Sequence, residues 1–318
     1  MSDAASPRLS KVALAAFVLG AASVFLLLAT AVPALYLGVQ AIRTINRSDG
    51  RLHGRRFAIA GLALSALTTV LTILGSIAMI LLHLQEKSYV AACANNLRQI
   101  GQAVQGYSEH NDHYFPPGTV PNPALAPGQR LSWQAAILSY LSAAKTAGKK
   151  SSSSGKKWAE EIDMKEAWDS PGNAELRRNV LSFLCPTFAH ELGPDQVGLT
   201  SYVGIAGVGD DAATLPRDDA RAGFFGYDRL LRASDISARL DATLSAVETT
   251  LDNGPWLAGG WPTVRGVLGE GDRYIGKDAA FGGLHRQGAN VLWADGSVRL
   301  VTEKIDPELF RSEARIAR

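Results

Sequence analysis

The stretch that decides the fold runs from Phe57 to Asp112 and reads FAIAGLALSALTTVLTILGSIAMILLHLQEKSYVAACANNLRQIGQAVQGYSEHND. Its first 28 residues, up to Leu84, contain no Asp, Glu, Lys or Arg. As a helix with a rise of about 1.5 Å per residue they would extend about 42 Å, which is more than the roughly 30 Å hydrocarbon core of a bilayer. This run therefore predicts a membrane span.

The residues that follow this apolar run continue the helix and contain no proline. Apolar side chains recur there at spacings of three and four, at Val90, Cys93, Leu97, Ile100 and Val104, which predicts one apolar face on an amphipathic helix. Because a short isolated helix is marginal in water, a folded domain must pack on this face. The sequence predicts one long helix, with its first half in lipid and its second half as the spine of a domain over residues 85–318.

A second apolar run lies nearer the N-terminus. A polar tail, residues 1–11, precedes 31 residues from Val12 to Ile42 that carry no charge and include Pro33. This length predicts another membrane span, with a kink or break at the proline. The run is too long for the apolar region of a cleavable signal peptide. Residues 12–84 are thus expected to form two transmembrane helices.

The loop between the two predicted spans, residues 43–56, is basic. It holds five arginines and one aspartate, a net charge of 5 − 1 = +4, whereas the tail has 2 − 1 = +1. Short positively charged loops stay in the cytoplasm, so the tail and residues 85–318 are expected on the opposite side of the bilayer. A nucleic-acid patch is the weaker interpretation, because the loop is short and the chain as a whole is nearly neutral.

The chain has two cysteines, Cys93 and Cys185, which are too few for a disulfide scaffold and lack the spacing of a metal site. Outside the cytoplasm a disulfide is permitted. Cys93 lies on the apolar face of the predicted spine, and Cys185 ends a candidate strand that should pack there. We expect the two to be bonded; the alternative is a pair of buried free thiols.

Short elements are expected between the spine and the C-terminus. Leu131–Leu141 has the apolar spacing of a short helix, and Val180–Cys185 and Thr200–Ile205 are rich in the β-branched and aromatic residues of strands. Residues 143–157, AAKTAGKKSSSSGKK, have low complexity and no apolar face, so they predict a mobile surface loop rather than a lipid-binding patch.

The clearest strand signal is a hairpin over residues 289–301. Alternating apolar residues flank the pair Asp295-Gly296, which predicts a two-residue type I′ turn with positive φ at both positions. His285 precedes this turn by ten positions and follows a Gly-Gly-Leu loop able to fold back beside it. We expect His285, Asp295 and Gly296 to act as a structural clasp, in which the imidazole bonds a backbone carbonyl or the Asp295 carboxylate and fixes the turn.

The first 84 residues resemble a small two-span bacterial family, domain of unknown function 4190 (DUF4190). The resemblance rests on Pro-Ala-Leu-x-Leu-Gly at residues 33–38, a basic glycine-containing loop at 50–56 and Ala-Ile-Ala-Gly at 58–61. The function of that family is itself uncharacterised.

Residues from about 86 to 310 resemble a large family of pilin-like bacterial envelope proteins, domain of unknown function 1559 (DUF1559). Its marker is a C-terminal His-x9-Asp-Gly motif, present here as His285 and Asp295-Gly296. Other family blocks occur in the same order: CANNLRQIG at 93–101, FPPG at 115–118, SW at 132–133, WDSPGN at 168–173, CP at 185–186, TSY at 200–202 and SDI at 234–236.

The resemblance implies an α+β fold similar to a pseudopilin, in which an antiparallel sheet wraps the outer half of a long helix that begins in the membrane. The pilin-type processing signal, Gly-Phe-Thr-Leu-x-Glu, is absent, because Arg55–Gly61 stands in its place without the glutamate. We therefore expect a permanently anchored, two-pass protein of the bacterial inner membrane that is not assembled by the pilin route.

No catalytic triad, phosphate loop, dinucleotide fingerprint or zinc-protease motif occurs. The expected function is that of a noncatalytic scaffold or docking module in a secretion-like or surface assembly, with the bilayer and other envelope proteins as partners and no nucleic acid, metal or cofactor. The alternative is an envelope enzyme or a metal-dependent binding protein that uses the region of His285 and Asp295. Calcium bound by the loop acids Asp210-Asp211 and Asp218-Asp219 belongs to this alternative.

Overall fold

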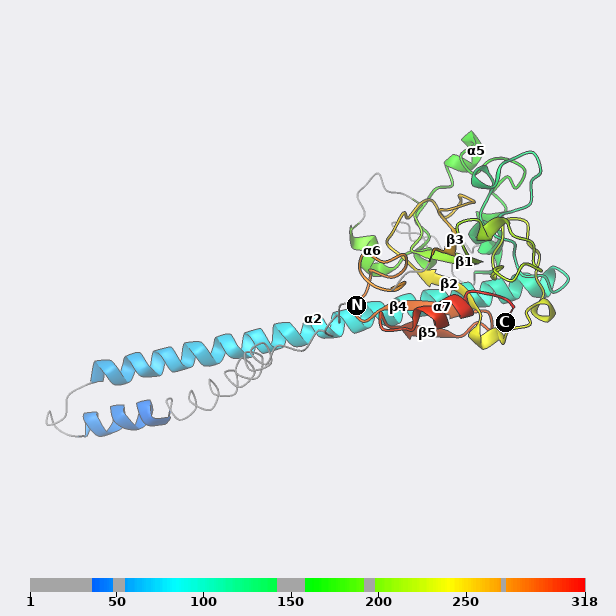
Figure 1. Ribbon diagram of the computed structural model, residues 1–318. Helices are drawn as coiled ribbons and strands as arrows, with labels where there is room; N and C mark the ends of the chain where they lie inside the picture. The colour runs from blue at the N-terminus through cyan, green and yellow to red at the C-terminus, as the bar shows by residue number, and fades with distance from the viewer. Residues whose placement is uncertain (1–35, 48–54, 142–157, 192–197, 270–272, 318) are drawn as a thin grey trace, which may run out of the picture. The chain divides into compact units, whose positions relative to one another are not determined.

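The computed structural model describes residues 36–47, 55–141, 158–191, 198–269 and 273–317 (Figure 1). The chain divides into two compact units, Met1–Gln85 and Glu86–Arg318. The predicted tail, most of the first apolar run and the loop at 143–157 lie outside the described residues.

Helix α2 runs without interruption from Arg55 to His110, 56 residues in all. In the first unit its large apolar side chains are exposed, for example Leu74 at 57% and Met79 at 70%. Within the described ranges it is the one helix long and apolar enough to cross a membrane. Of the first predicted span the structure describes only a helix over residues 36–46, so the two-span hairpin stays a prediction.

In the second unit α2 buries the apolar face that its sequence predicts. Cys93, Leu97 and Ile100 are fully buried and Val104 is 4% exposed, whereas Val90 at the start of the face is half-buried. The residues on the opposite face remain in solvent. Periodicity alone therefore located the contact surface of this part of the helix.

A five-stranded sheet packs on this face in the order β3-β1-β2-β4-β5. The strands are β1 (Tyr202–Val208), β2 (Leu244–Glu248), β3 (Val264–Val267), β4 (Ala289–Trp293) and β5 (Val298–Val301). Strands β1 and β3 are parallel, and the other pairs are antiparallel. The expectation of a purely antiparallel sheet is thus wrong: β3 is a short strand reached by a long connection from β1, and its four residues carry no alternation that would have predicted it.

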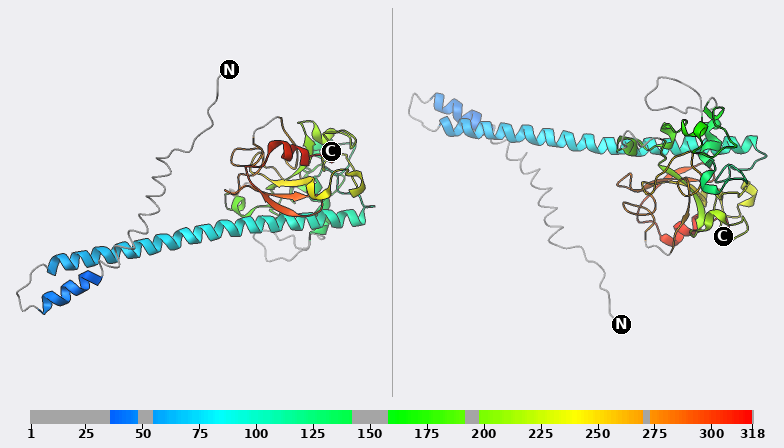
Figure 2. Two further views of the ribbon diagram at one scale, coloured as in Figure 1. Left: turned by 60° about the horizontal axis from the view of Figure 1, so that its bottom comes forward. Right: turned by 90° about the horizontal axis from the view of Figure 1, so that it is seen from above.

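Strands β1 to β4 are buried on both faces, whereas the edge strand β5 is exposed at Arg299 and Leu300. Alternate side chains such as Tyr202, Ala246 and Leu292 join the core that contains Leu97 and Ile100 of α2. Their neighbours on the other face pack against Phe310 of helix α7 (Pro307–Glu313). Figure 2 shows α2 and α7 on opposite sides of the strands. The fold is therefore α+β, with three layers formed by helix, sheet and a short C-terminal helix.

The remaining helices are short. The predicted helix near Trp133 is confirmed as α3 (Trp133–Ile137), where the Ser132 hydroxyl accepts bonds from the first-turn amides. The others are η1 (Pro127–Gln129), η2 (Leu138–Tyr140), α5 (Pro171–Ala174), η3 (Leu181–Phe183), α6 (Pro186–Glu191), η4 (Ala212–Thr214), η5 (Ala233–Asp235) and η6 (Leu240–Ala242).

The strand predicted at Val180–Cys185 is wrong, because this segment forms the 3-10 helix η3. The side-chain amide of Asn96 on α2 donates to the carbonyls of Leu181 and Leu184, at 3.1 and 2.9 Å. A side chain of the spine helix thus takes the place of a neighbouring strand as the partner of these carbonyls, and a sequence pattern does not reveal such a partner.

The hairpin of β4 and β5 is confirmed, but its turn differs from the expected one. The Trp293 amide donates to the Ser297 carbonyl, and the Gly296 amide donates to the Trp293 carbonyl, both at 2.9 Å. Of the pair Asp295-Gly296 only Gly296 has positive φ, at +85°. This is a three-residue loop in which Gly296 takes the left-handed position after a tight turn, so the type I′ assignment is wrong.

Candidate functional site

A disulfide joins Cys93 of α2 to Cys185, the residue before α6. The two Cα atoms are 5.2 Å apart and both residues are fully buried, with Leu284 and Phe188 packed beside them. The bond closes a sequence separation of 92 residues. It attaches the spine helix to the segment that leads into α6.

His285 lies directly against this disulfide. Its Nε2 atom is 3.5 Å from Sγ of Cys185 and 3.8 Å from Oε1 of Glu248, while Nδ1 is 3.6 Å from Oε1 of Glu86. The imidazole is fully enclosed, and Nδ1 has no hydrogen-bond partner in the described part of the chain. Burial lowers the pKa of His285, and the Glu86 carboxylate acts in the opposite direction. The ring is therefore neutral at pH 7.

Glu248 is the second buried titratable group of this cluster. It ends strand β2 with no exposed surface. Asn290 of β4 holds its carboxyl group from two sides, through the backbone amide at 2.6 Å and the side-chain amide at 3.0 Å. The same side-chain amide donates to the Val90 carbonyl of α2 at 3.2 Å. Burial raises the pKa of Glu248 to about 7, against the two bonds from Asn290.

Glu248 is not among the candidate site residues that the sequence analysis identified. A usable signal existed: a lone carboxylate ends an apolar run that is short enough to be a buried strand. Nothing in the sequence placed it beside His285, since the two residues are 285 − 248 = 37 positions apart and the tertiary structure brings them together.

The contact predicted between the His285 imidazole and the Asp295 carboxylate is not formed. The Asp295 carboxylate accepts a bond from the Ser297 amide at 2.8 Å and is exposed, whereas the His285 ring lies against Cys185, Glu248 and Glu86. The expected bond between His285 and Asp295 is therefore wrong. The motif supplies two separate features, a local turn and a buried imidazole.

A pocket of about 450 Å³ lies beside the imidazole. Charged and polar residues line much of it: Glu86, Thr187, Lys277, His285, Arg286 and Glu303. Two of its buried polar atoms, His285 Nδ1 and Thr187 Oγ1, have no hydrogen-bond partner among the residues that the structure describes. Buried polar groups of this kind are normally satisfied, so the pocket is a place where a small polar species can bind.

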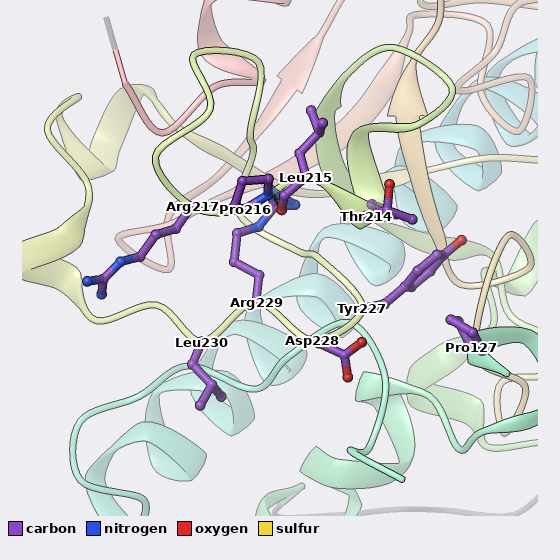
Figure 3. Close-up of a pocket in the computed structure, with 10 residues that line it drawn as sticks. Pro127, Thr214, Leu215, Pro216, Arg217, Tyr227, Asp228, Arg229 and Leu230 are labelled. Atoms are coloured by element: carbon purple, nitrogen blue, oxygen red, sulfur yellow. Dashed lines mark hydrogen bonds between the residues drawn. The ribbon is translucent and has the colours of Figure 1, made fainter. Parts of the chain in front are cut away.

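A second pocket, of about 390 Å³, lies between Pro127 and the segments 213–217 and 227–230 (Figure 3). The Arg229 side chain points there toward Leu215 and Pro216. Its guanidinium donates to the carbonyls of Leu215, Ala206, Ala212 and Phe225, at 2.9–3.2 Å, and burial lowers its pKa to about 10. Arg229 thus joins strand β1, the η4 segment and the segment around Phe225.

The acidic loop pairs considered for calcium are partly engaged with arginine. Arg221 forms a two-bond pair with Asp211, at 2.7 and 2.9 Å, and lies 3.7 Å from Asp219. The Asp210 carboxylate accepts from the Asp211 amide at 2.9 Å. A cation at Asp211 would have to displace Arg221.

The fold and the site together define an α+β protein built on a long helix, with a buried disulfide, histidine and glutamate where helix and sheet meet. Residues 90–308 match the model of a protein family of unknown function, DUF1559, and the chain belongs to this family. Residues 12–75 match a domain of unknown function, DUF4190. Comparison with curated proteins and with solved structures finds no match. Both resemblances expected from the sequence are confirmed.

Proposed function

We propose that the protein is a membrane-anchored, noncatalytic, pilin-like scaffold or docking module that displays residues 86–318 outside the cytoplasm of a bacterial cell. The observation that carries this proposal is the two-part character of α2. One continuous helix has exposed apolar side chains up to Leu84 and a buried apolar face from Cys93 onward. Such a helix serves as both anchor and spine.

Two further observations support an extracytoplasmic domain. A disulfide within the core is characteristic of oxidising compartments. The arginine-rich segment at 43–56 precedes α2, and short loops of this charge stay cytoplasmic. Both observations support a folded unit on the outer side of the inner membrane and a second span upstream.

Reporter fusions test the topology. Alkaline phosphatase, which is active only outside the cytoplasm, should be active when fused after Lys87 or after Arg318. Green fluorescent protein should fluoresce when fused at Asp49 and stay dark after Lys87. A fluorescent fusion together with a silent phosphatase at Lys87 would overturn the proposed orientation.

Native electrophoresis of mildly solubilised envelope tests the docking role. At its native expression level the full chain should migrate in a complex larger than its own detergent-bound monomer, and cross-linking should yield discrete adducts to envelope proteins. Migration as a monomer, with no adducts, would contradict a scaffold or docking function.

A metal-dependent role of the His285 region is the alternative, and one observation favours it. Four residues with metal-binding side chains, two cysteines, a histidine and a glutamate, meet in one buried cluster. Asp295 has no part in this cluster, because its carboxylate is exposed and bonded to Ser297.

A further inference from the structure

Four side-chain atoms that can bind a metal ion lie close together in the cluster around the disulfide. Cys93 and Cys185 each offer Sγ, Glu248 a carboxylate oxygen and His285 a ring nitrogen, and all four atoms lie within 4.8 Å of one another. All four residues are buried. They come from α2, the start of α6, the end of β2 and the loop before β4, so the tertiary structure alone brings them together.

We propose that these four residues form a tetrahedral zinc site in the reduced protein, and that the disulfide is the closed, metal-free state of this site. The inference does not depend on the scaffold function. Thiolate sulfur and imidazole nitrogen are ligands that zinc prefers, whereas calcium and magnesium prefer oxygen alone. A mixed set of two thiolates, one imidazole and one carboxylate therefore selects zinc among common divalent cations.

The distances fit this geometry. Around zinc, with bonds of about 2.3 Å to sulfur and about 2.0–2.1 Å to nitrogen and oxygen, tetrahedral angles place sulfur about 3.5 Å from nitrogen and nitrogen about 3.3 Å from oxygen. The structure has 3.5 Å from Cys185 Sγ to His285 Nε2 and 3.8 Å from His285 Nε2 to Glu248 Oε1. All four ligand atoms lie within 4.8 Å of one another, and the two bonded sulfur atoms must separate to about 3.8 Å, which is a shift of less than about 2 Å.

Groups around the four ligands already orient them for this role. Nδ1 of His285 faces the Glu86 carboxylate at 3.6 Å, so a proton on Nδ1 leaves the Nε2 lone pair directed toward Cys185 and Glu248. Asn290 holds the Glu248 carboxyl group through two donors. In zinc sites the second ring nitrogen of a ligating histidine usually faces a carboxylate. A ligating carboxylate usually accepts further hydrogen bonds.

Reduction of the disulfide makes the two cysteines available as zinc ligands. A dithiol reductant attacks the disulfide, supplies two electrons and two protons, and leaves as its own disulfide, while Cys93 and Cys185 become thiols. Zinc then displaces the two thiol protons, because only the thiolates bind it. With two thiolates, one carboxylate and a neutral imidazole, the loaded site has a net charge of 2 − 3 = −1.

Metal titration of the full chain in detergent micelles tests the proposal. The protein is reduced anaerobically with a phosphine that does not bind zinc, desalted and mixed with zinc in competition with a chromogenic chelator. The expected result is one tightly bound zinc per chain in the reduced protein and none in the oxidised protein. Cobalt in place of zinc should give the visible bands of a tetrahedral ion and a thiolate charge-transfer band.

Variants separate this site from adventitious binding. Cys185→Ser should abolish stoichiometric zinc binding and the charge-transfer band, and His285→Gln should abolish stoichiometric binding. Glu86→Gln leaves all four ligands in place and should weaken zinc binding about 10–100-fold through the lost outer contact. His110→Gln, at an exposed residue on the same helix, is the matched control and should bind as the wild type does.

Three results would overturn the proposal. One is the absence of zinc from the reduced wild type. Another is an adventitious ion only, recognised by equal affinity in the wild type, His285→Gln and Cys185→Ser. The third is a reduced chain that unfolds, by circular dichroism, and does not refold when zinc is added.

Discussion

The two parts of helix α2 place similar apolar residues in opposite surroundings. Leu74, in the part before Glu86, is 57% exposed, and Leu97, in the part after it, is fully buried. The first part is apolar on every face, whereas the second is apolar on one face and polar on the other. A helix apolar all round needs an apolar environment on all sides, and a one-faced helix needs one partner surface. The first part therefore needs an apolar environment on all sides, and the second part needs the folded unit that packs on its one apolar face.

The largest effect should come from the bond that attaches the second part of α2 to the rest of its unit. Replacing Cys93 and Cys185 together with alanine should lower the free energy of unfolding by about 4–5 kcal/mol in the chain-entropy model for a loop of this length. Urea denaturation of the full chain in micelles, with a chelator present to exclude metal, measures the loss.

Thiol labelling provides the control for the disulfide. Unreduced, denatured wild type should take up no thiol reagent, and the reduced protein should take up two equivalents. Labelling of both cysteines without reduction would show that the disulfide is absent. The second part of α2 would then not be attached covalently to the rest of its unit.

The same substitution in each part tests the comparison most directly. Leu97→Ala removes a fully buried side chain and should cost about 2–5 kcal/mol of stability. Leu74→Ala should change the unfolding of the second unit by less than about 0.5 kcal/mol. Both values come from urea denaturation followed by tryptophan fluorescence, since all six tryptophans lie beyond residue 132. Equal losses would show that the comparison is wrong.

The second part of α2 is also linked, through Val90 and Asn290, to a buried carboxyl group. The pKa of Glu248 is raised from 4.5 to about 7 on folding, so between these values the folded state keeps a proton that the unfolded state has lost. This contribution is complete below about pH 4.5 and disappears as the pH rises through 7. At about 1.4 kcal/mol per pKa unit it is on the order of 3 kcal/mol.

Unfolding of the oxidised, metal-free protein at pH 5 and pH 8 measures this effect. Relative to Glu248→Gln, the wild type should lose stability as the pH rises. His285, whose pKa is lowered, acts in the opposite direction, and the same pair of measurements in a His285→Gln background removes its contribution, because the two side chains are only 3.8 Å apart. Glu303→Gln, at an exposed carboxylate, is the control. Parallel curves for the wild type and Glu248→Gln would contradict the assignment.

The smallest effect concerns the glycines of the two parts. A Cβ on Gly101 would lie 2.9 Å from Leu292 Cδ1 and 3.5 Å from Gly296 in the hairpin turn, whereas nothing lies within 4 Å of one on Gly75. Gly101→Val should therefore cost about 1–3 kcal/mol through overpacking. Gly75→Val should leave the unfolding of the second unit unchanged. A tolerated Gly101→Val would show that helix and hairpin pack loosely.

Local signals in the sequence determined the parts of this protein that depend on near neighbours along the chain. The uncharged run up to Leu84 and the spacing of Cys93, Leu97 and Ile100 defined the long helix and its buried face. The alternation around Asp295-Gly296 defined the hairpin. These signals work because a helix and a tight hairpin are formed by residues a few positions apart, whose side-chain directions follow from backbone geometry.

The tertiary structure decided what depends on distant residues. It made the sheet mixed by pairing β1 with β3, and it placed the 3-10 helix Leu181–Phe183, held by Asn96, where a strand was expected. It also placed Glu248 and His285 at the cysteine pair, while the turn of the hairpin kept Asp295 in solvent. Side chains separated by tens of residues meet only where packing of the whole core brings their elements together, and no local pattern encodes that meeting.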